Sequence, residues 1–380
     1  MDNPFNPSFG RIPAVYLQRK KLIADVSQGI ENLNSSYTIS IVYGMRGIGK
    51  TVFLTAMDRK ISAYPDWIVV NLAMGMKLLP SFINSLYLNA DSKLKKSFKS
   101  IEGLNFSNFG LSLSTDVSKL TYQDILTNMF DEVRKNDVKV LITLDEVKLC
   151  QELKDFARCY QLLNRQGYPI ALMIAGLSEN ISELKNENIT SFLLRGKRIA
   201  LSALNLSQVE ASYSKVFKES GYQVSKKILE KMALMTMGYS YAFQLLGYLV
   251  LKAAKKSKVI DQNTLECIKS EYLLVLKQNV YTKVLSSLSK QDRKFVLAMA
   301  QSPKHCVSIK EIHERLNRPS NFVANYRRRL LDDQVIKSTN YGEVAFTLPF
   351  FKEYVLRQYR FERDCKIVCV RMNNSLNLFL

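Results

Sequence analysis

The sequence predicts an α/β protein with a parallel sheet that carries helices on both faces, then an all-α segment and a C-terminal module of three helices and a hairpin. Three observations support this prediction. Apolar segments rich in β-branched residues alternate with amphipathic segments up to about residue 204. A glycine-rich turn joins the first apolar segment to the amphipathic segment after it. Beyond residue 204, helical patterns follow one another as far as residue 331.

Composition restricts the classes of function. The chain has 380 residues, enough for two or three domains, and its 47% hydrophobic content is typical of globular proteins. No apolar run is long enough for a membrane span, and the N-terminus lacks the pattern of a signal peptide, so we expect a cytoplasmic protein. Six cysteines without a C-x-x-C pair and only two histidines argue against a zinc site.

Net charge points to an anionic partner. The formal charge is +20, from 54 Lys and Arg against 34 Asp and Glu. The excess is densest at residues 281–380, which hold 18 basic and 9 acidic residues. Nucleic acid is therefore a candidate partner of the C-terminal module.

The first strand and the turn after it form the most specific motif. Tyr37–Tyr43 is rich in β-branched and aromatic residues, Gly44–Thr51 fits G-x-x-x-x-G-K-[ST], and Val52–Met57 continues as a helix. Backbone amides in such a loop surround phosphates, the lysine contacts the β- and γ-phosphates, and the hydroxyl binds Mg²⁺. We expect ATP to bind here, with Thr51 as a metal ligand and with contacts from Gly44, Met45, Arg46, Gly47, Ile48, Gly49, Lys50, Thr51 and Val52.

A second acidic motif follows another strand. Val138–Leu144 is almost wholly apolar and ends in Asp145-Glu146, the Walker B arrangement. We expect Asp145 to hold the Mg²⁺ shell and Glu146 to polarise the attacking water. The carboxyl ends of parallel strands lie at one edge of a sheet, so the two motifs should meet there. Past the strand Ile170–Gly176, Ser178 either contacts the γ-phosphate or the water, or is a solvated loop serine.

The other elements of residues 1–204 complete this predicted nucleotide-binding core. Residues 1–36 contain an irregular arm and a helix over 16–33, and the arm is either a disordered tail or an ordered strap near the nucleotide base. Residues 74–118 form an excursion that either touches a substrate or neighbouring subunit, or is decoration. It holds a helix over 91–100 and a hairpin over 101–113. The remaining predicted elements are a strand over 66–72, helices over 120–135 and 151–165, and a strand fed by the basic turn at 194–198.

Residues 205–284 are expected to form a helical lid. Four consecutive helices are predicted over 208–220, 225–236, 241–256 and 262–278. Ser207 and Glu210 fit a capping box at the first of them. Gly238–Gln244 joins the second and third helices.

Residues 285–362 are expected to form a winged helix-turn-helix, and we assign no structure to residues 363–380. Ser289 with Asp292 and Ser308 with Glu311 cap the first two helices, and the third runs from Asn321 to Leu331. Its apolar stripe is Phe322, Val323, Tyr326 and Leu330. The module either binds DNA or is a protein-contact surface. The DNA contacts would come from Asn321, Asn325, Arg328, Arg329 and Lys337.

With these motifs in place, the chain resembles AAA+ ATPases of the replication-initiator (origin-recognition-like) kind that end in a winged helix. The segment from Asn3 to Pro13 is similar to the family's base-contacting arm, and Gln18-Arg19 falls where Gly-Arg is frequent. Ser178 matches the sensor 1 position loosely. The resemblance implies a homo-oligomer in which an arginine finger, Arg195 or Arg198, reaches a neighbour's γ-phosphate.

One departure from this family lies in Gly238–Gln244. Initiator ATPases carry a sensor 2 arginine there, and related signal-transduction ATPases carry Gly-x-Pro, whereas Ser240 stands in the proline's place and no arginine is present. The departure predicts slow or switch-like ATP hydrolysis.

The sequence thus predicts an ATPase, with ATP and Mg²⁺ as ligands, that switches a winged helix on double-stranded DNA. The alternative is a regulatory, signal-transduction-type nucleotide switch whose winged helix contacts protein. A weaker alternative is a scaffold that binds nucleotide without hydrolysing it.

Overall fold

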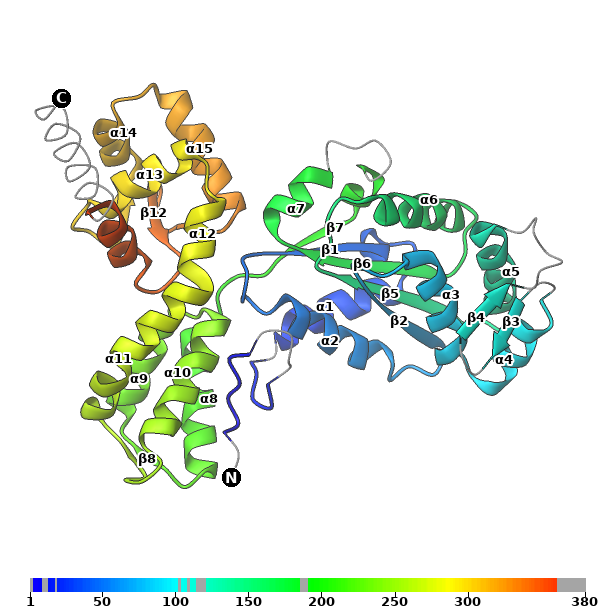
Figure 1. Cartoon of the computed structure of the whole chain (residues 1–380), viewed down its shortest axis with the longest axis horizontal. Coiled ribbons are helices and arrows are strands. Elements are labelled where there is room, and N and C mark those ends of the chain that lie inside the picture. Colours follow the sequence, from blue (N-terminus) through cyan, green and yellow to red (C-terminus); the bar gives the residue numbers. More distant parts are fainter. Residues whose placement is uncertain are drawn as a thin grey trace, which may run out of the picture. The chain divides into compact units, whose positions relative to one another are not determined.

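The computed structural model describes residues 3–8, 13–17, 19–101, 104–107, 110–113, 121–184 and 191–360 (Figure 1). The predictions for Phe9, Gly10, Gln18, residues 114–118 and residues 361–380 lie outside this range. The chain forms two compact units. One comprises Gln18–Gly44 and Gly49–Ser202, and the other comprises Met1–Leu17, Met45–Ile48 and Ala203–Leu380.

The first unit is built on the predicted parallel sheet, which is confirmed. Five strands pair in the order β2-β5-β6-β1-β7, and every pairing is parallel. All seven residues of β6 and the five central residues of β5 are buried, as expected for strands covered on both faces. The strands are β1 Ile39–Tyr43, β2 Trp67–Ala73, β5 Lys139–Asp145, β6 Ile170–Gly176 and β7 Lys197–Ala200.

Helices cover both faces of this sheet (Figure 1). The helices α1 Lys20–Glu31 and α2 Lys50–Ile61 pack together on one face. The other face carries α3 Leu78–Asn89, α5 Tyr122–Lys135 and α6 Gln151–Arg165. The predicted α/β class with helices on both faces is therefore confirmed. Short helical turns, Ser36–Thr38, α7 Ser178–Glu183 and Ser191–Arg195, connect the longer elements.

The region expected to be an excursion begins with a core helix. Leu78, Phe82, Ile83 and Leu86 of α3 are buried in the main apolar cluster of the sheet. The ring of Phe82 lies 6.0 Å from that of Phe130 on α5 and 6.1 Å from that of Phe156 on α6. After α3, the predicted basic helix is α4 Ser92–Lys99, and the predicted hairpin is β3 Leu104–Ser107 with β4 Gly110–Leu113.

The second unit contains the four helices predicted after residue 205. They are α8 Leu206–Glu219, α9 Lys226–Thr236, α10 Ser240–Ala253 and α11 Gln262–Leu276, with the two-residue strands β8 Gln223–Val224 and β9 Val259–Ile260 paired between them. The predicted capping box at Ser207 is wrong, because Asn205 is the N-cap. Its side chain accepts from the amides of Ser207 and Gln208.

The described part of the N-terminal arm is an ordered strap on these helices. Phe5 is 1% exposed and lies within 6.0 Å of the rings of Tyr213, Phe217 and Phe243. Gly247 makes room for it, since a Cβ there would lie 2.7 Å from the Phe5 ring. A tail without order is therefore excluded for residues 3–8.

The C-terminal module has the expected winged-helix elements. A π-helical turn, Lys277–Tyr281, leads into α12 Thr282–Ser287. Ser289 and Asp292 form the predicted capping box, and Ser308 caps the second helix. The three helices are α13 Lys290–Ala300, α14 Ile309–Leu316 and α15 Ser320–Asp332, and the antiparallel sheet β10-β12-β11 contains Val307–Ser308, Glu343–Phe346 and Ile336–Ser338. Residues 351–360 are helical, and within the described ranges no helix combines the length and apolarity needed to traverse a bilayer.

Phe82→Ala should lower the free energy of unfolding by about 3–5 kcal/mol, because it leaves a cavity among the aromatic rings of the core. Leu88→Ala, on the same helix but 57% exposed, should change it by less than about 0.5 kcal/mol. Urea unfolding measures both values. Equal effects would show that α3 does not belong to the core.

Candidate functional site

The phosphate loop connects β1 to α2 and depends on two left-handed glycines. Gly47 has φ +75° and Gly49, the residue before α2, has φ +99°. Residues with a Cβ rarely adopt these conformations, so the two glycines permit the sharp return of the chain between strand and helix. Met45 and Ile48 are buried at 6% and 5% exposure, which anchors the loop on either side of Gly47.

The structure brings the two predicted metal ligands together. The Thr51 hydroxyl donates to Asp145 Oδ2 at 2.6 Å, although 94 residues separate them in the chain. The other carboxylate oxygen of Asp145 accepts from the amide of Glu146 at 2.8 Å. Lys50 Nζ donates to the carbonyl oxygen of Gly44 at 2.9 Å, which folds the side chain back over the loop.

These side chains fit a magnesium–triphosphate ligand. A hydroxyl and a carboxylate are hard oxygen donors of the kind that Mg²⁺ prefers, and Thr51 is exposed to solvent. The first turn of α2 supplies backbone amides and the positive end of a helix dipole, which favour phosphate. The donor set therefore suits Mg²⁺ and a nucleotide.

Glu146 has an unusual backbone conformation. It is exposed, and its φ of +54° lies in the left-handed region, which costs a residue with a Cβ free energy. The amide of Val147 donates to the carbonyl of Ala175 on the neighbouring strand at 2.9 Å, and so fixes the backbone just after Glu146. Strain of this kind is frequent at active sites.

A third carboxyl group, that of Asp58 on α2, lies near this edge and was not among the predicted site residues. Burial raises its pKa to about 7. A hydrogen bond with Thr143 opposes this rise, and the charge of Asp145 adds to it. Within the described part of the chain, Asp58 Oδ1 is buried and has no hydrogen-bond partner. Thr143 in turn donates to Asn71 Oδ1 at 2.7 Å, so a polar cluster lies under the metal ligands.

Ser178 is the first residue of α7, just beyond β6. Its Oγ is buried and has no hydrogen-bond partner among the described residues. This burial disfavours a solvated loop serine, and contact with a phosphate or with the attacking water stays a prediction.

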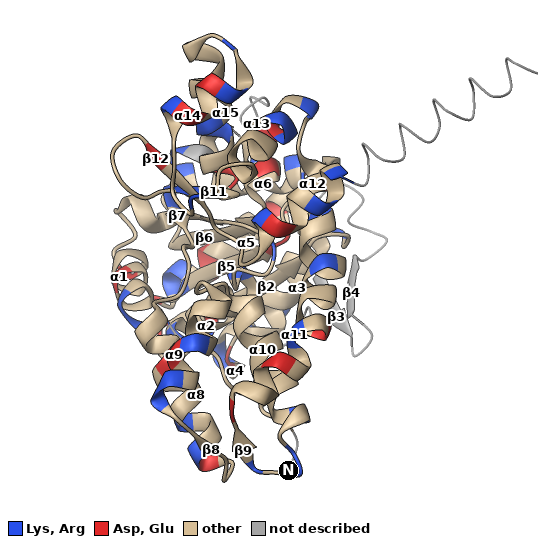
Figure 2. Ribbon diagram, turned by 90° about the vertical axis from the view of Figure 1, so that its left-hand side faces the viewer, with Lys and Arg blue, Asp and Glu red and all other residues tan. Residues whose placement is uncertain are grey.

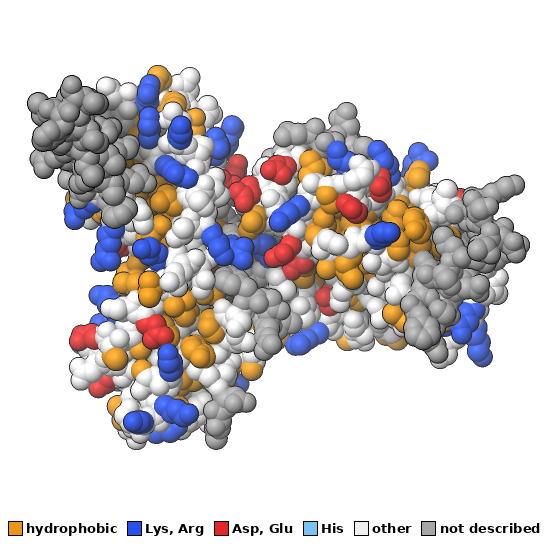
Figure 3. Space-filling model, viewed as in Figure 1, with side chains coloured by type: hydrophobic (Ala, Val, Ile, Leu, Met, Phe, Trp, Pro, Cys, Tyr) orange, Lys and Arg blue, Asp and Glu red, His pale blue; other side chains and the backbone are white. Residues whose placement is uncertain are grey.

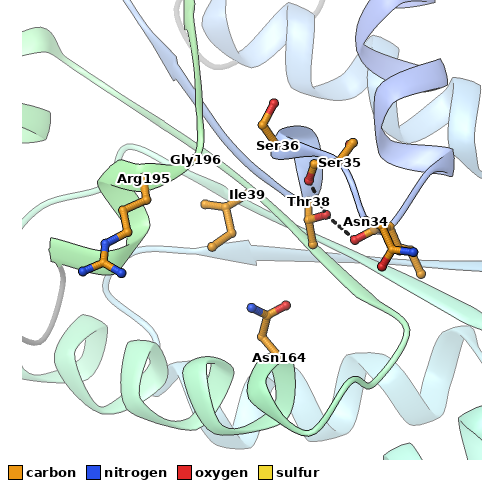
Figure 4. Close-up of a pocket in the computed structure, with 9 residues that line it drawn as sticks. Asn34, Ser35, Ser36, Thr38, Ile39, Asn164, Arg195 and Gly196 are labelled. Atoms are coloured by element: carbon orange, nitrogen blue, oxygen red, sulfur yellow. Dashed lines mark hydrogen bonds between the residues drawn. The ribbon is translucent and has the colours of Figure 1, made fainter.

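Arg195 lies away from the loop's edge of the sheet, whereas Arg198 is opposite Ile41 in the middle of β1. In the parallel pairing of β7 with β1, Lys197 is opposite Ser40 and Ala200 is opposite Tyr43. Arg195 therefore precedes the amino end of β7, where it lines a surface pocket with Asn34, Ser35, Ser36, Thr38, Ile39 and Asn164 (Figure 4). The phosphate loop begins at the opposite end of β1. This position does not suit the chain's own nucleotide, and action on a neighbouring copy stays a prediction.

Met45 links the loop to the C-terminal module. Its amide donates to Gln334 Oε1 at 3.4 Å, and its sulfur accepts from the Thr347 hydroxyl at 3.4 Å. Gln334 lies between α15 and β11, where its φ of +57° turns the chain. These three residues belong to one compact unit.

The five residues predicted to contact DNA are all exposed. Figure 2 marks Lys and Arg positions along the ribbons of α13, α14 and α15, and Figure 3 shows basic side chains on the C-terminal module. Arg329, however, also pairs with Asp292 at 3.0 Å, and the Asp292 side chain is only 3% exposed. This pair ties α15 to α13. The predicted apolar stripe is present, with Val323 and Leu330 buried and the rings of Phe322 and Tyr326 packed 4.4 Å apart.

Comparison with known proteins shows similarity of fold over nearly the whole chain. A Walker-type ATPase of Pyrococcus abyssi has a TM-score of 0.58 at 14% identity, over 90% of this chain and 96% of that one. The ORC2 protein of Aeropyrum pernix, in ADPNP–ADP complexes, has a TM-score of 0.59 at 12% identity, over 95% and 98%. The chain therefore shares its fold with this Walker-type ATPase and this ORC2 protein, in agreement with the resemblance of its motifs.

Sequence comparison adds two shorter matches. A stretch of 114 residues is 25% identical to the chromosomal replication initiator protein DnaA of Cutibacterium acnes, and it spans 29% of this chain and 21% of that protein. Residues 278–355 match a family described as a domain of unknown function (DUF8462). That range contains the three helices and the small sheet of the C-terminal module.

Asp58→Asn should remove a pH dependence of stability. Because the pKa of Asp58 is raised to about 7, the folded state keeps a proton that the unfolded chain releases above about pH 4. This bound proton stabilises the folded state fully below about pH 4. The stabilisation is lost as the pH rises to about 7, by up to about 1.4 kcal/mol per pH unit. Thermal unfolding should therefore show equal stability at about pH 4 and a growing advantage of the variant above it. A constant difference would contradict the assignment.

Proposed function

We propose that the chain binds ATP with Mg²⁺ at Gly44–Thr51, hydrolyses it to ADP and phosphate, and uses the nucleotide state to switch a DNA-binding winged helix. The observation that carries the nucleotide site is the 2.6 Å contact of Thr51 with Asp145. A hydroxyl from a glycine loop and a carboxylate from another strand meet there at the carboxyl edge of a parallel sheet. In α/β folds of this type, ligands bind at that edge.

Each residue of the proposed site has an assigned role. Lys50 leaves the Gly44 carbonyl and binds the β- and γ-phosphates, while the amides of the loop surround them. When bound, Mg²⁺ neutralises charge that develops on the phosphate oxygens. Thr51 and Asp145 hold its shell, and Glu146 accepts a proton from, or orients, the attacking water. Arg195 or Arg198 serves a neighbouring copy, and Ser178 contacts the γ-phosphate or the water.

The C-terminal module is the DNA-binding part of this proposal. We assign residues 205–284 to a helical lid and 285–362 to the winged helix. Asn321, Asn325 and Arg328 on α15 and Lys337 on β11 are exposed donors suited to base edges and phosphates. Arg329 adds charge to the same surface, but its pair with Asp292 gives it a second, structural role.

Lys50→Ala should abolish binding of a fluorescent ATP analogue, because it removes the positive charge proposed to contact the β- and γ-phosphates. Glu146→Gln should keep binding but lower the rate of phosphate release by about 100-fold or more, the usual contribution of a general base. Lys60→Ala, at the other end of α2, is the matched control and should behave as wild type. ATP binding by Lys50→Ala equal to that of wild type would show that the site is misplaced.

Arg328→Ala should weaken binding of duplex DNA and reduce the salt slope by about one, without a change in thermal stability. Arg329→Ala is compared with it. That variant should also lower the melting temperature, because it leaves the buried Asp292 carboxylate without its cation. Filter binding at about 50 and 200 mM salt measures the first effect. Absence of duplex binding by wild type at low salt would favour a winged helix that contacts protein.

A further inference from the structure

The carbonyl oxygens of the phosphate loop are hydrogen-bonded in an ordered way. The outer carbonyls accept from donors within the loop and α2. Lys50 Nζ donates to the Gly44 carbonyl, the Ile48 amide to the Met45 carbonyl, and the Phe53 amide to the Gly49 carbonyl. The three in the middle accept from three consecutive residues almost 200 positions later. Tyr239 Oη donates to the Arg46 carbonyl at 2.5 Å, the Tyr241 amide donates to the Gly47 carbonyl at 3.0 Å, and Ser240 Oγ donates to the Ile48 carbonyl at 2.9 Å.

The turn that provides these donors is itself well fixed. Gly238 has φ +75°, and its carbonyl accepts from the amide of Leu204 at 2.8 Å. Tyr239 is 2% exposed, and burial raises the pKa of its phenol well above the usual value, so it remains a donor. The helix α10 begins at Ser240, and its second amide, that of Tyr241, needs an acceptor outside the helix. The carbonyl of Gly47 provides that acceptor.

Gly47 is also required by the close approach of this turn. A Cβ at Gly47 would lie 2.5 Å from the Tyr239 hydroxyl and 3.0 Å from Tyr241 Cβ. The glycine therefore serves two purposes, the left-handed conformation of the loop and contact with the start of α10. The Ser240 hydroxyl donates to the third of these carbonyls, that of Ile48, at an ordinary hydrogen-bond distance.

Carbonyl positions determine where the loop amides point. In a planar trans peptide, the C=O of one residue and the N–H of the next point in opposite directions. Fixing the carbonyls of Arg46, Gly47 and Ile48 therefore fixes the amides of Gly47, Ile48 and Gly49. In this structure the Ile48 amide donates to the Met45 carbonyl at 3.3 Å, a long bond that a phosphate oxygen can replace.

We propose that Tyr239 and Ser240 are positioning residues for the nucleotide, which hold the phosphate loop in its binding conformation through the carbonyls of Arg46 and Ile48. They act without touching the phosphates. They lie in Gly238–Gln244, the segment in which the resemblance implies an arginine and this sequence has none. The inference depends on the proposed ATP site. It assigns to this segment a contribution to binding by preorganisation, since a loop that is already ordered loses less entropy when the ligand binds.

The test is the affinity for a fluorescent ATP analogue with Mg²⁺ in Tyr239→Phe, Ser240→Ala and the double variant. Each substitution removes one hydroxyl oxygen and should weaken binding about three- to tenfold, the equivalent of one hydrogen bond, and the double variant should weaken it further. Tyr272→Phe is the matched control. The Tyr272 hydroxyl also donates to a backbone carbonyl in the same unit, that of Met235 at 3.1 Å, but it does not contact the loop.

Stability and affinity separate a positioning role from a merely structural one. Without nucleotide, Tyr239→Phe and Tyr272→Phe should lower the melting temperature by similar amounts, whereas only Tyr239→Phe should change affinity. Wild-type affinity in the double variant would overturn the inference, while lack of binding by wild type, or equal binding by Lys50→Ala, would overturn the proposed function instead. Should Tyr239→Phe not fold, Ser240→Ala decides alone, because alanine suits the first position of a helix.

Discussion

The backbone of the phosphate loop must satisfy two opposing requirements. Its amides have to face an anion, and its carbonyl oxygens, which then point away from the anion, have to find donors elsewhere. Here the donors come from Lys50 at one end, from α2 at the other, and from Tyr239–Tyr241 in the middle. Much of the architecture follows from this requirement. The glycines at 47 and 49 shape the loop, and the sharp turn at Gly238 and the start of α10 supply donors to its carbonyl oxygens.

The elements that position the nucleotide site could be predicted from the sequence because their patterns are local. The strand, loop and helix around Gly44–Thr51 carry their information within twenty residues, and the same is true of the strand before Asp145. Parallel pairing then brings Thr51 and Asp145 to one edge of the sheet. The helix α3 was missed although its apolar residues are close together. Pro80 lies in the first turn of this helix, where proline is tolerated because the amides lack intrahelical acceptors.

What the sequence could not supply are contacts between residues far apart. No pattern around Gly238–Gln244 indicates that the segment donates to a loop 190 residues earlier, because the donors include a backbone amide and a common hydroxyl. Asp58 is similar, since a carboxyl group on an amphipathic helix is usually solvated, and only packing shows its burial. Arg328 and Arg329 are adjacent and chemically identical, yet only the fold shows that Arg329 pairs with a buried aspartate. Charge counts alone treat the two arginines as equivalent.

The bond from the Met45 amide to Gln334 has a consequence for both proposed ligands. Gln334 lies two residues beyond the end of α15, so one hydrogen bond connects the loop proposed to bind phosphate with the segment just after the helix proposed to bind DNA. Coupling free energy between two sites is reciprocal. If ATP raises the affinity for DNA through this bond, bound DNA raises the affinity for ATP by the same factor. The amount of nucleotide bound to such a molecule would then depend on whether the molecule is on DNA.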